Sequence, residues 1–315
     1  MSNFPLVSIG LPTYNGAACV ERALRSLVDQ TYPRLELVVC DDASEDRTAD
    51  VCASYAKQCS FIRFWRNPKN LGAHFNFVKT LEDSRGKYYL WADQEDWWAP
   101  ELVSALVAAL ERDPAAVASM SAVKILSEEG SERFEVRIDD VDRPRERSFL
   151  ENASSVVSKR GRSRNKIQSN LFIHGLIHRK YLVAAIEAYP GVFMSERQIV
   201  CQLALSGRLI FVDEVLWKQT SHHTPLAARR LPGDANIIAQ TRPWRRIRYV
   251  SGLGMSIIRS RIIPFHRKLY LPVLVWRWFW ELVVRKESRK VLRRIVPAPV
   301  YRRLKILRAR LRENS

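Results

Sequence analysis

The sequence predicts an α/β fold, in which a mostly parallel sheet is flanked by helices and followed by a basic helical appendage. Short apolar runs alternate with helical periodicities over the first 112 residues, a pattern typical of repeated strand–helix units. Polar clusters follow several of these runs. In parallel sheets, ligands bind beyond the carboxyl ends of the strands, which is where these clusters would lie. The excess of positive charge lies in the last quarter of the chain. We therefore expect a neutral domain over residues 1–225 and a basic region over 226–315.

The first strand is expected at residues 6–11, an apolar run that Pro12 should end. Apolar residues then recur at helical spacing over 17–30, which predicts a helix. The same alternation continues along the chain. It predicts strands at 35–40, 61–65 and 88–91, and helices at 48–57, 72–81 and 100–112.

The second half of the domain is less regular in sequence. Residues 127–170 are polar and charged, and we expect strands and a flexible loop there. An apolar run predicts a strand at 171–178. A helix is expected at 196–205, where Gly207 should stop it.

Composition limits the class of protein. Hydrophobic residues make up 47% of the 315 residues, which allows a sizeable core. The five cysteines show neither CxxC pairs nor metal-site spacing, which indicates reduced thiols in a cytosolic protein. Residues 1–5 lead directly into the first strand, so we expect no signal peptide.

Three carboxylates lie within four positions after the fourth expected strand: Asp93, Glu95 and Asp96. Like charges this close disfavour one another, so a cation should offset them. Oxygen ligands favour Mg²⁺ or Mn²⁺ over zinc. The alternative is a solvated helix N-terminus before Pro100, where acids interact well with the helix dipole.

Several motifs follow one another along the chain. They are PLVSIGLPTYN at 5–15, DDASEDRT at 41–48, Asn70-Leu71-Gly72, Asn76, Gly86-Lys87-Tyr88 and Asp93-Gln94-Glu95-Asp96. In this order and spacing they resemble family 2 glycosyltransferases of the GT-A fold, a Rossmann-like α/β architecture. The last cluster is similar to the DQDD variant of bacterial rhamnosyltransferase-like members. The resemblance is clear over residues 5–112 and continues weakly to about residue 223.

The resemblance implies a binding site for a nucleotide-sugar donor. Thr13, Asn15 and Asp42 match donor-binding positions, and Thr13 and Asp42 would contact the nucleobase. Alternatively, Thr13 is a plain turn residue and Asp42 a helix cap. Trp97 follows the acidic cluster, and its indole would stack on a sugar ring. Packing between a helix and the sheet is the alternative for Trp97.

The acidic cluster corresponds to the family's ribose- and metal-binding acids. Asp93 is assigned to the donor, and Glu95 and Asp96 are assigned to Mn²⁺ or Mg²⁺. Glu95 stands where aspartate is usual, so its reach toward a metal differs. His222 matches a family histidine that can reach the metal or the diphosphate, although Thr220 replaces the arginine expected before it. A loop histidine without a ligand is the alternative for His222.

The acceptor side of the cleft is expected at the helix predicted over 196–205. Family members often show a Glu-Asp pair that opens a helix ending in Leu-x-x-x-Gly, and Leu203 to Gly207 set that register here. Counting back places Glu196 at the position of the catalytic base, with Ser195 before it. A carboxylate there would take the proton of the acceptor hydroxyl, an effect of ~10²–10⁴-fold. An exposed first-turn acid is the alternative.

The C-terminal quarter is both basic and aromatic. Residues 241–315 carry 21 Lys and Arg against three Glu, which accounts for the +18 of the whole chain. Residues 269–284 are apolar and aromatic, but shorter than the ~20 residues that a membrane span needs. We expect an interfacial helix there and peripheral contact with an anionic membrane. A helical appendage packed on the catalytic domain is the alternative, and without a nucleic-acid motif we expect no nucleic-acid partner.

The prediction is an inverting glycosyltransferase that is cytoplasmic and works at the inner face of the cell membrane. It would move a sugar from a UDP- or dTDP-type donor to a hydroxyl of a cell-surface glycan or polyprenyl-linked acceptor. A nucleotidyltransferase is one alternative, although residues 13–16 lack the basic side chains of its loop. A catalytically inactive homologue that binds membrane or nucleic acid through its tail is the other.

Overall fold

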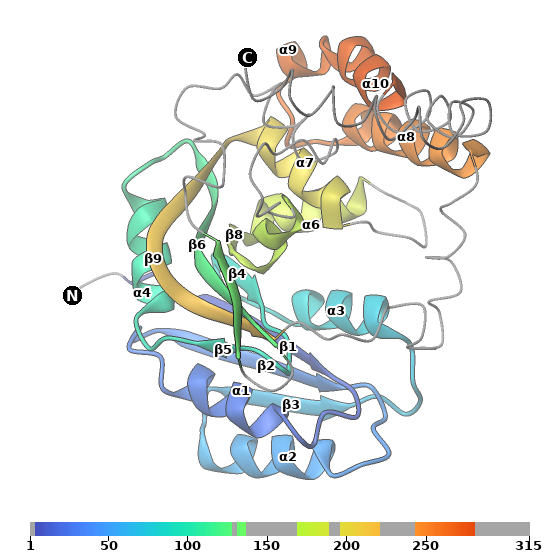
Figure 1. The fold of residues 1–315 in the computed structure, drawn as a ribbon. Helices are drawn as coiled ribbons and strands as arrows, with labels where there is room; N and C mark the ends of the chain where they lie inside the picture. Colours follow the sequence, from blue (N-terminus) through green and yellow to red (C-terminus); the bar gives the residue numbers. More distant parts are fainter. Residues whose placement is uncertain (1–3, 128–130, 137–168, 189–195, 221–242, 281–315) are drawn as a thin grey trace, which may run out of the picture.

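The structure, a computed structural model, describes residues 4–127, 131–136, 169–188, 196–220 and 243–280. Its strands form one nine-stranded sheet with helices on both faces (Figure 1). The strands are β1 (Val7–Thr13), β2 (Leu35–Asp41), β3 (Ile62–Arg66), β4 (Tyr88–Trp91), β5 (Trp97–Trp98), β6 (Ala116–Leu126), β7 (Glu132–Val136), β8 (Leu176–His178) and β9 (Arg208–Thr220). The helices are α1 (Val20–Val28), α2 (Thr48–Gln58), α3 (Ala73–Glu82), α4 (Leu102–Glu111), the 3₁₀ helix η1 (Ser169–His174), α6 (Arg179–Glu187), α7 (Glu196–Ser206), α8 (Pro243–Arg259), α9 (Phe265–Lys268) and α10 (Leu271–Phe279).

The N-terminal half of the sheet is parallel, in the order β3-β2-β1-β4. β1 runs two residues past its expected end, through Pro12 to Thr13, which lies opposite Asp41 of β2. β4 accompanies β1 only as far as Gly10 opposite Trp91. From there β1 is bordered by β2 alone, so a proline without an N–H is tolerated. The ends of β1 and β2 therefore lie side by side.

The second half of the sheet adds antiparallel partners. β8 is antiparallel to both β4 and β6, and so joins the two halves. β6 and β9 are long and parallel to each other. β7 pairs antiparallel with β6, and β5 pairs antiparallel with β9. The predicted parallel arrangement thus describes the first four strands, and the sheet as a whole is mixed.

Helices cover the sheet where the sequence predicts them, within a few residues. α1 and α2 lie below the sheet and α3 above it in Figure 1. α1 begins at Val20 instead of residue 17, because a turn comes first, in which the amides of Cys19 and Val20 both bond the Gly16 carbonyl at 2.9 Å. The strand predicted over 171–178 is wrong in its first part, where η1 precedes the short β8.

The C-terminal helices α8 and α10 pack against each other. Leu253, Ile257 and Trp278 are fully buried and belong to the same hydrophobic cluster as the sheet. The Arg267 guanidinium donates to the Leu205 carbonyl of α7 at 2.8 Å, which ties this region to the domain. The expected boundary at 225/226, and most of residues 127–170, lie outside the described residues. Within the described part of the chain, no helix is long and apolar enough to cross a membrane.

Candidate active site

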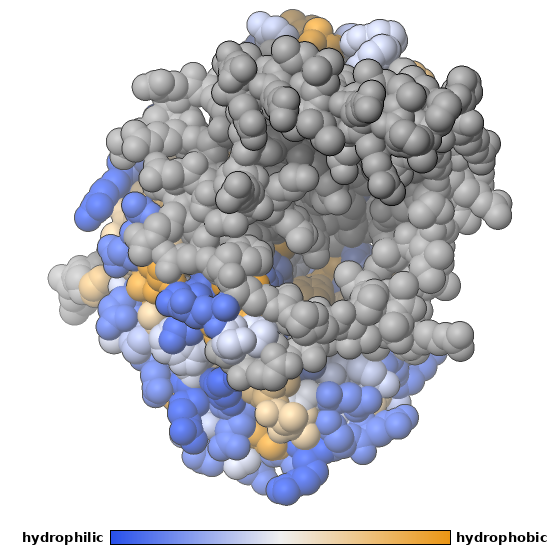
Figure 2. Space-filling model, in the orientation of Figure 1, coloured by the Kyte–Doolittle hydropathy of each residue, from blue (hydrophilic) through white to orange (hydrophobic). Residues whose placement is uncertain are grey.

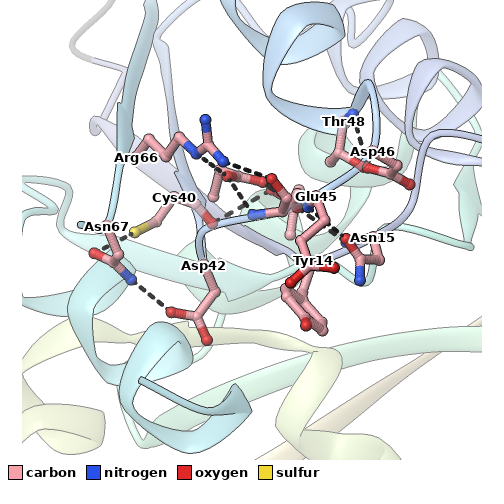
Figure 3. A network of polar contacts seen from close by, with 12 residues as sticks. Tyr14, Asn15, Cys40, Asp42, Glu45, Asp46, Thr48, Arg66 and Asn67 are labelled. Atoms are coloured by element: carbon pink, nitrogen blue, oxygen red, sulfur yellow. Dashed lines mark hydrogen bonds and ion pairs between the residues drawn. The ribbon is translucent and has the colours of Figure 1, made fainter. Parts of the chain in front are cut away.

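The segment from Asp41, which ends β2, to Thr48, which begins α2, is held by hydrogen bonds within the N-terminal half of the sheet (Figure 3). We call it the first acid loop. Asp41 has a fully buried carboxylate that accepts from the Ser44 amide at 3.0 Å and pairs with Arg66 Nε at 3.2 Å. Short acceptor side chains that bond their own loop favour such tight turns. Asp41 therefore shapes the loop and does not face a ligand.

The same loop also closes onto the turn that precedes α1. Asp46 accepts hydrogen bonds from the Thr48 amide at 2.9 Å and from the Ala17 amide at 3.1 Å. Thr48 Oγ1 in turn accepts from the Gly16 amide at 2.7 Å. The segments after β1 and after β2 are thus fixed relative to each other.

Asp42 is buried and holds the segment that leads into α3. Its carboxylate accepts from Asn67 Nδ2 and from the amides of Leu71 and Gly72, each at 2.9 Å. Gly72 has a φ of 91°, a conformation that glycine adopts without strain. Three of the roughly four acceptor positions of this carboxylate are filled by the protein. Its predicted contact with a nucleobase remains a prediction, and the structure shows its role in closing the loop.

Thr13 and Asn15 stand at and just beyond the end of β1. Thr13 is buried, with its hydroxyl 3.4 Å from the Cys40 carbonyl. Asn15 is exposed, with a φ of 45°, and its side-chain oxygen accepts from the Glu45 amide at 2.9 Å. Ala43 has a φ of 59°, which costs ~1–2 kcal/mol for a residue with a Cβ. Such strain persists where the surroundings enforce it and is common at ligand sites.

The loop after β4, residues 93–96, lies between the two halves of the sheet. We call it the second acid loop. Asp93 Oδ2 is 3.5 Å from Nδ1 of His174, which ends η1. The His174 side chain is 13% exposed and its ring lies 5.4 Å from that of Trp217. His174 was not among the predicted site residues, because a histidine inside an apolar run carries no signal of its spatial partner.

Asp96 is 1% exposed and turned toward β9. Its two oxygens accept from the Thr220 amide at 2.9 Å and from the Trp217 indole at 2.8 Å. Burial and then the charge of Asp93 raise the pKa of Asp96 well above its usual range, with a further contribution from Glu95, while the two hydrogen bonds oppose the shift. Asp96 thus fastens the loop to β9, and this arrangement favours Asp93 and Glu95 as the acids that face a cation.

The backbone of the second acid loop is fixed from two further sides. The Glu95 carbonyl accepts from Thr220 Oγ1 at 2.8 Å and from Arg22 Nη2 at 2.5 Å. Gln94 bonds both the amide and the carbonyl of Tyr14 at 3.0 Å through its side chain. A Cβ on Gly16 would lie 2.3 Å from Gln94 Oε1, so a larger residue there would displace this bridge. The two acid loops are joined through the turn after β1.

Trp97 and Trp98 form β5 beside the second acid loop. Trp98 is buried in the core. Trp97 is half-buried, and Lys218 Nζ lies 4.3 Å from the centre of its ring. Lys218 therefore occupies one face of the predicted sugar-stacking indole.

Glu196, the predicted base, is the first residue of α7. α7 packs against η1, which carries His174 beside Asp93. His222 and Ser195 lie outside the described residues, and nothing in the structure bears on them. Among the residues that the structure does describe, no group of three or more His, Cys, Asp or Glu side chains could enclose a metal ion.

The residues present suit a cation that is shared with a ligand. Asp93 and Glu95 are both partly exposed, while Asp96 is engaged with β9. Mg²⁺ is commonly bound through one or two carboxylates together with substrate phosphates, and keeps several waters. Two partly exposed carboxylates fit this mode and do not require a cage made by the protein alone.

Comparisons with known proteins agree with the motifs. The sequence model of "Glycosyl transferase family 2" matches residues 8–175, more than half of the chain. A putative teichuronic acid biosynthesis glycosyltransferase of Bacillus subtilis, TuaG, is 35% identical over 99 residues, 31% of this chain and 39% of that protein. A glycosyltransferase of Haemophilus influenzae is 30% identical over 128 residues, 41% of this chain and 40% of that protein. The chain thus spans about two fifths of the length of these relatives.

Two solved structures share the arrangement of strands and helices. S. aureus TarS 1–349 in complex with UDP-GlcNAc superposes with a TM-score of 0.60 at 16% identity, covering 87% of this chain and 72% of that chain. The mannosyltransferase PcManGT from Pyrobaculum calidifontis, in complex with GDP-Man and Mn²⁺, gives 0.51 at 20% identity, covering 98% and 81%. At these identities the likeness shows the fold, which is GT-A. With a family match over more than half of its length, the chain belongs to glycosyl transferase family 2.

Proposed function

We propose that this glycosyltransferase acts with inversion, and moves a sugar from a UDP- or dTDP-type donor to a hydroxyl of a cell-surface glycan or polyprenyl-linked acceptor. The observation that carries the proposal is the meeting of two acid loops at one edge of the sheet, joined through residues 14–16. Strand ends at such an edge are where α/β proteins bind nucleotides. The TarS neighbour in complex with UDP-GlcNAc and the relative named for teichuronic acid biosynthesis support this direction.

Asp93 and Glu95 would hold Mn²⁺ or Mg²⁺ together with the donor diphosphate. Their partial exposure and the engagement of Asp96 with β9 support this division of roles. A bound cation supplies positive charge that offsets the charge on the leaving diphosphate. His222 is proposed as a further ligand, on the resemblance alone.

The nucleobase end of the donor is proposed to lie at Thr13, Asn15 and Asp42. These residues meet where β1 and β2 end, and their hydrogen bonds hold the first acid loop in one conformation. A rigid loop binds a nucleotide with little ordering cost. Trp97 would line the sugar end through the ring face that Lys218 leaves uncovered.

Glu196 is proposed as the base, from its position at the start of α7. As the acceptor oxygen attacks the anomeric carbon, its proton passes to the carboxylate and the bond to the diphosphate oxygen breaks. Attack on the face opposite the leaving group inverts the anomeric centre. Proton transfer to a positioned carboxylate contributes ~10²–10⁴-fold.

Titration calorimetry of the purified chain with UDP, dTDP and GDP in the presence of Mn²⁺ tests the donor site. We expect UDP or dTDP to bind, and Asp93→Asn to weaken binding at least about tenfold. Asp50→Asn, on the exposed side of α2, is the matched control and should bind unchanged. If none of the three nucleotides binds, the proposal is wrong.

Product analysis separates the proposal from a nucleotidyltransferase. The glycosyltransferase releases a nucleoside diphosphate from its donor, and a nucleotidyltransferase releases pyrophosphate from a nucleoside triphosphate. Detection of pyrophosphate would favour the second activity. We propose that the reaction takes place in the cytoplasm, at the inner face of the membrane, where a lipid-linked acceptor would be presented.

A further inference from the structure

Exposed apolar side chains are concentrated in the C-terminal helices. Among the described residues, eleven large hydrophobic side chains are exposed, and eight of them lie between 255 and 280. These eight are Met255, Ile258, Phe265, Leu269, Tyr270, Val273, Trp276 and Trp280. In Figure 2 orange and pale-blue atoms lie together at the top edge, where Figure 1 places α9 and α10. Such a concentration is uncommon on a surface that faces water alone.

α10 is apolar on its outer side as well as on its inner side. Leu274 and Trp278 are buried and face the core, with exposures of 2% and 0%. Val273 and Trp276, on the other side, are 58% and 65% exposed. Arg277 is the only charged residue of α10, and a helix with apolar residues on opposite sides is normally buried on both. The outer side of α10 therefore suits an apolar partner.

Three aromatic side chains at the end of α10 lie close together. The Trp276 ring lies 6.5 Å from those of both Phe279 and Trp280, and Phe265 is 77% exposed. Tryptophan and tyrosine are favoured at the boundary between lipid headgroups and acyl chains, because one end of the ring is apolar and the other forms hydrogen bonds. The composition suits an interface and not a fully apolar medium.

The positive charge around these side chains favours a partner that is negatively charged. Residues 243–280 contain eight Lys and Arg and no Asp or Glu. Arg259, the last residue of α8, and Arg261 are exposed and follow the exposed Ile258 in sequence. A second copy of this chain would bring the same positive charge against it, which is unfavourable. An anionic bilayer offers opposite charge and an apolar layer together.

We propose that α8–α10 form a docking face for an anionic bilayer, with Trp276 and its apolar neighbours at the depth of the headgroups and Arg259 and Arg261 against lipid phosphates. The proposal rests on the proposed function for its biological setting, since it would hold the catalytic domain beside a lipid-linked acceptor. It extends the predicted interfacial helix over 269–284 to α8 and α9, which also carry exposed apolar side chains. The helices lie on the bilayer and do not cross it.

Flotation of the full chain with vesicles tests the docking face. We expect the chain to float with vesicles of 30% phosphatidylglycerol in phosphatidylcholine, and only weakly with phosphatidylcholine alone. Raising the salt concentration from about 0.05 to about 0.5 M should release much of the bound protein, because headgroup attraction is screened. Equal binding to both kinds of vesicle would overturn the proposal.

Two variants locate the surface. Trp276→Ala is expected to reduce vesicle partitioning at least about tenfold, because the exposed indole loses its apolar burial. Phe75→Ala, at an exposed aromatic residue of α3, is the matched control and should partition unchanged. Circular dichroism and the melting temperature should match the unaltered chain in both cases.

Two double variants that change the net charge equally test whether the positions of the charges matter. Arg259→Gln with Arg261→Gln should lower partitioning roughly 25-fold, at about fivefold for each cation near an anionic surface. Lys57→Gln with Arg112→Gln, exposed on α2 and at the end of α4, should leave partitioning within about twofold. Equal losses in both pairs would show attraction by net charge alone and would overturn the docking face.

Other readouts keep this inference separate from the proposed function. Nucleotide binding in solution, without vesicles, should be the same for Trp276→Ala and the unaltered chain. Asp93→Asn should lose nucleotide binding while still floating with vesicles. If light scattering shows a dimer that Trp276→Ala abolishes, a second copy covers the face and the bilayer proposal fails.

Discussion

The first acid loop, after β2, and the second acid loop, after β4, both carry several carboxylates, but their hydrogen-bond partners come from different parts of the chain. Asp41 and Asp42 are bonded by residues no more than 30 positions away. Asp96 is bonded by Trp217 and Thr220, 121 and 124 positions away. The first loop is a local structure, and the second is a joint between the two halves of the sheet.

The difference separates stability from chemistry. In the first loop Asp41 and Asp42 are buried and bonded by the protein, so changes there should lower stability first. In the second loop Asp96 is buried in this way, while Asp93, which lies beside His174, and Glu95 are partly exposed. Changes at those two acids should lower turnover first.

The largest expected effect is on turnover, from Glu95→Gln. The variant keeps the shape of the side chain and removes the charge that would face the cation, so kcat/KM should fall about 10³-fold. Because Glu95 is partly exposed, the melting temperature should stay within about 2 °C. Turnover is measured as nucleoside diphosphate release. Glu101→Gln, exposed at the start of α4, is the control and should keep full activity. Equal activity of both variants would remove Glu95 from the site.

Asp42→Ala tests the first acid loop. Asn67 Nδ2 and the amides of Leu71 and Gly72 would each lose a hydrogen bond. Gly72 would keep its bond to Asn70 Oδ1 and Asn67 its longer one to Asn76 Oδ1, so the Leu71 amide is most affected. We expect the free energy of unfolding to fall by ~3 kcal/mol, as measured by urea denaturation. Asp50→Ala, in the exposed first turn of α2, should cost no more than ~1 kcal/mol. A loss no greater than that of Asp50→Ala would show that the loop is not held by this carboxylate.

His178, the last residue of β8, makes the stability of the folded chain depend on pH. Burial, followed by the charges of Lys87 and Lys180, lowers the pKa of His178 to about 4. The unfolded chain therefore binds more protons between about pH 6.5 and pH 4, so stability is present above this window and is lost as the pH falls through it.

His178→Phe should remove this contribution. The phenyl ring keeps the packing against Tyr88, whose ring lies 4.5 Å away. Between pH 7 and pH 4 the unaltered chain should lose ~2 kcal/mol more of its unfolding free energy than the variant does. Parallel pH profiles for the two proteins in urea denaturation would contradict the assignment.

The smallest expected effect tests the second loop as a joint. Thr220→Val removes the hydroxyl that bonds the Glu95 carbonyl and keeps the amide that bonds Asp96. We expect a loss of ~1 kcal/mol in the unfolding free energy and a severalfold rise in KM for the donor, with kcat less affected. Thr31→Val, at an exposed threonine that also bonds a carbonyl, is the matched control and should leave KM unchanged. If KM responds equally to both, the joint has no bearing on the donor.

The sequence predicts local features of this molecule better than distant ones. Alternating apolar runs place β1 to β4 within two residues of their observed bounds, because strand burial depends on neighbours in sequence. The meeting of the acid loops also follows from parallel strands, whose ends share one edge. Over 171–178 the apolar run is buried whether it forms a strand or η1, so its pattern does not distinguish the two.

The partners of the second acid loop could not be predicted in the same way. Thr220 stands out in the sequence only as the absence of an expected arginine, yet it bonds both Glu95 and Asp96. His174 has no motif that ties it to Asp93, 81 positions earlier. Such pairs depend on how the second half of the sheet closes on the first, which neither periodicity nor spacing encodes.

The register of the strand β9 limits where insertions and deletions can occur in this part of the chain. It runs unbroken from the end of α7 to Thr220 beside Asp96. Its pairing with β6 skips Asp213 and Glu214, which are exposed, and shifts again at Leu216, so that the register is even only from Trp217 to Thr220. A one-residue insertion beyond that point would turn the end of the strand over and take Thr220 away from Asp96. Relatives with longer or shorter versions of this strand should therefore carry their insertions and deletions at the irregularity, where they leave the end at Thr220 in place.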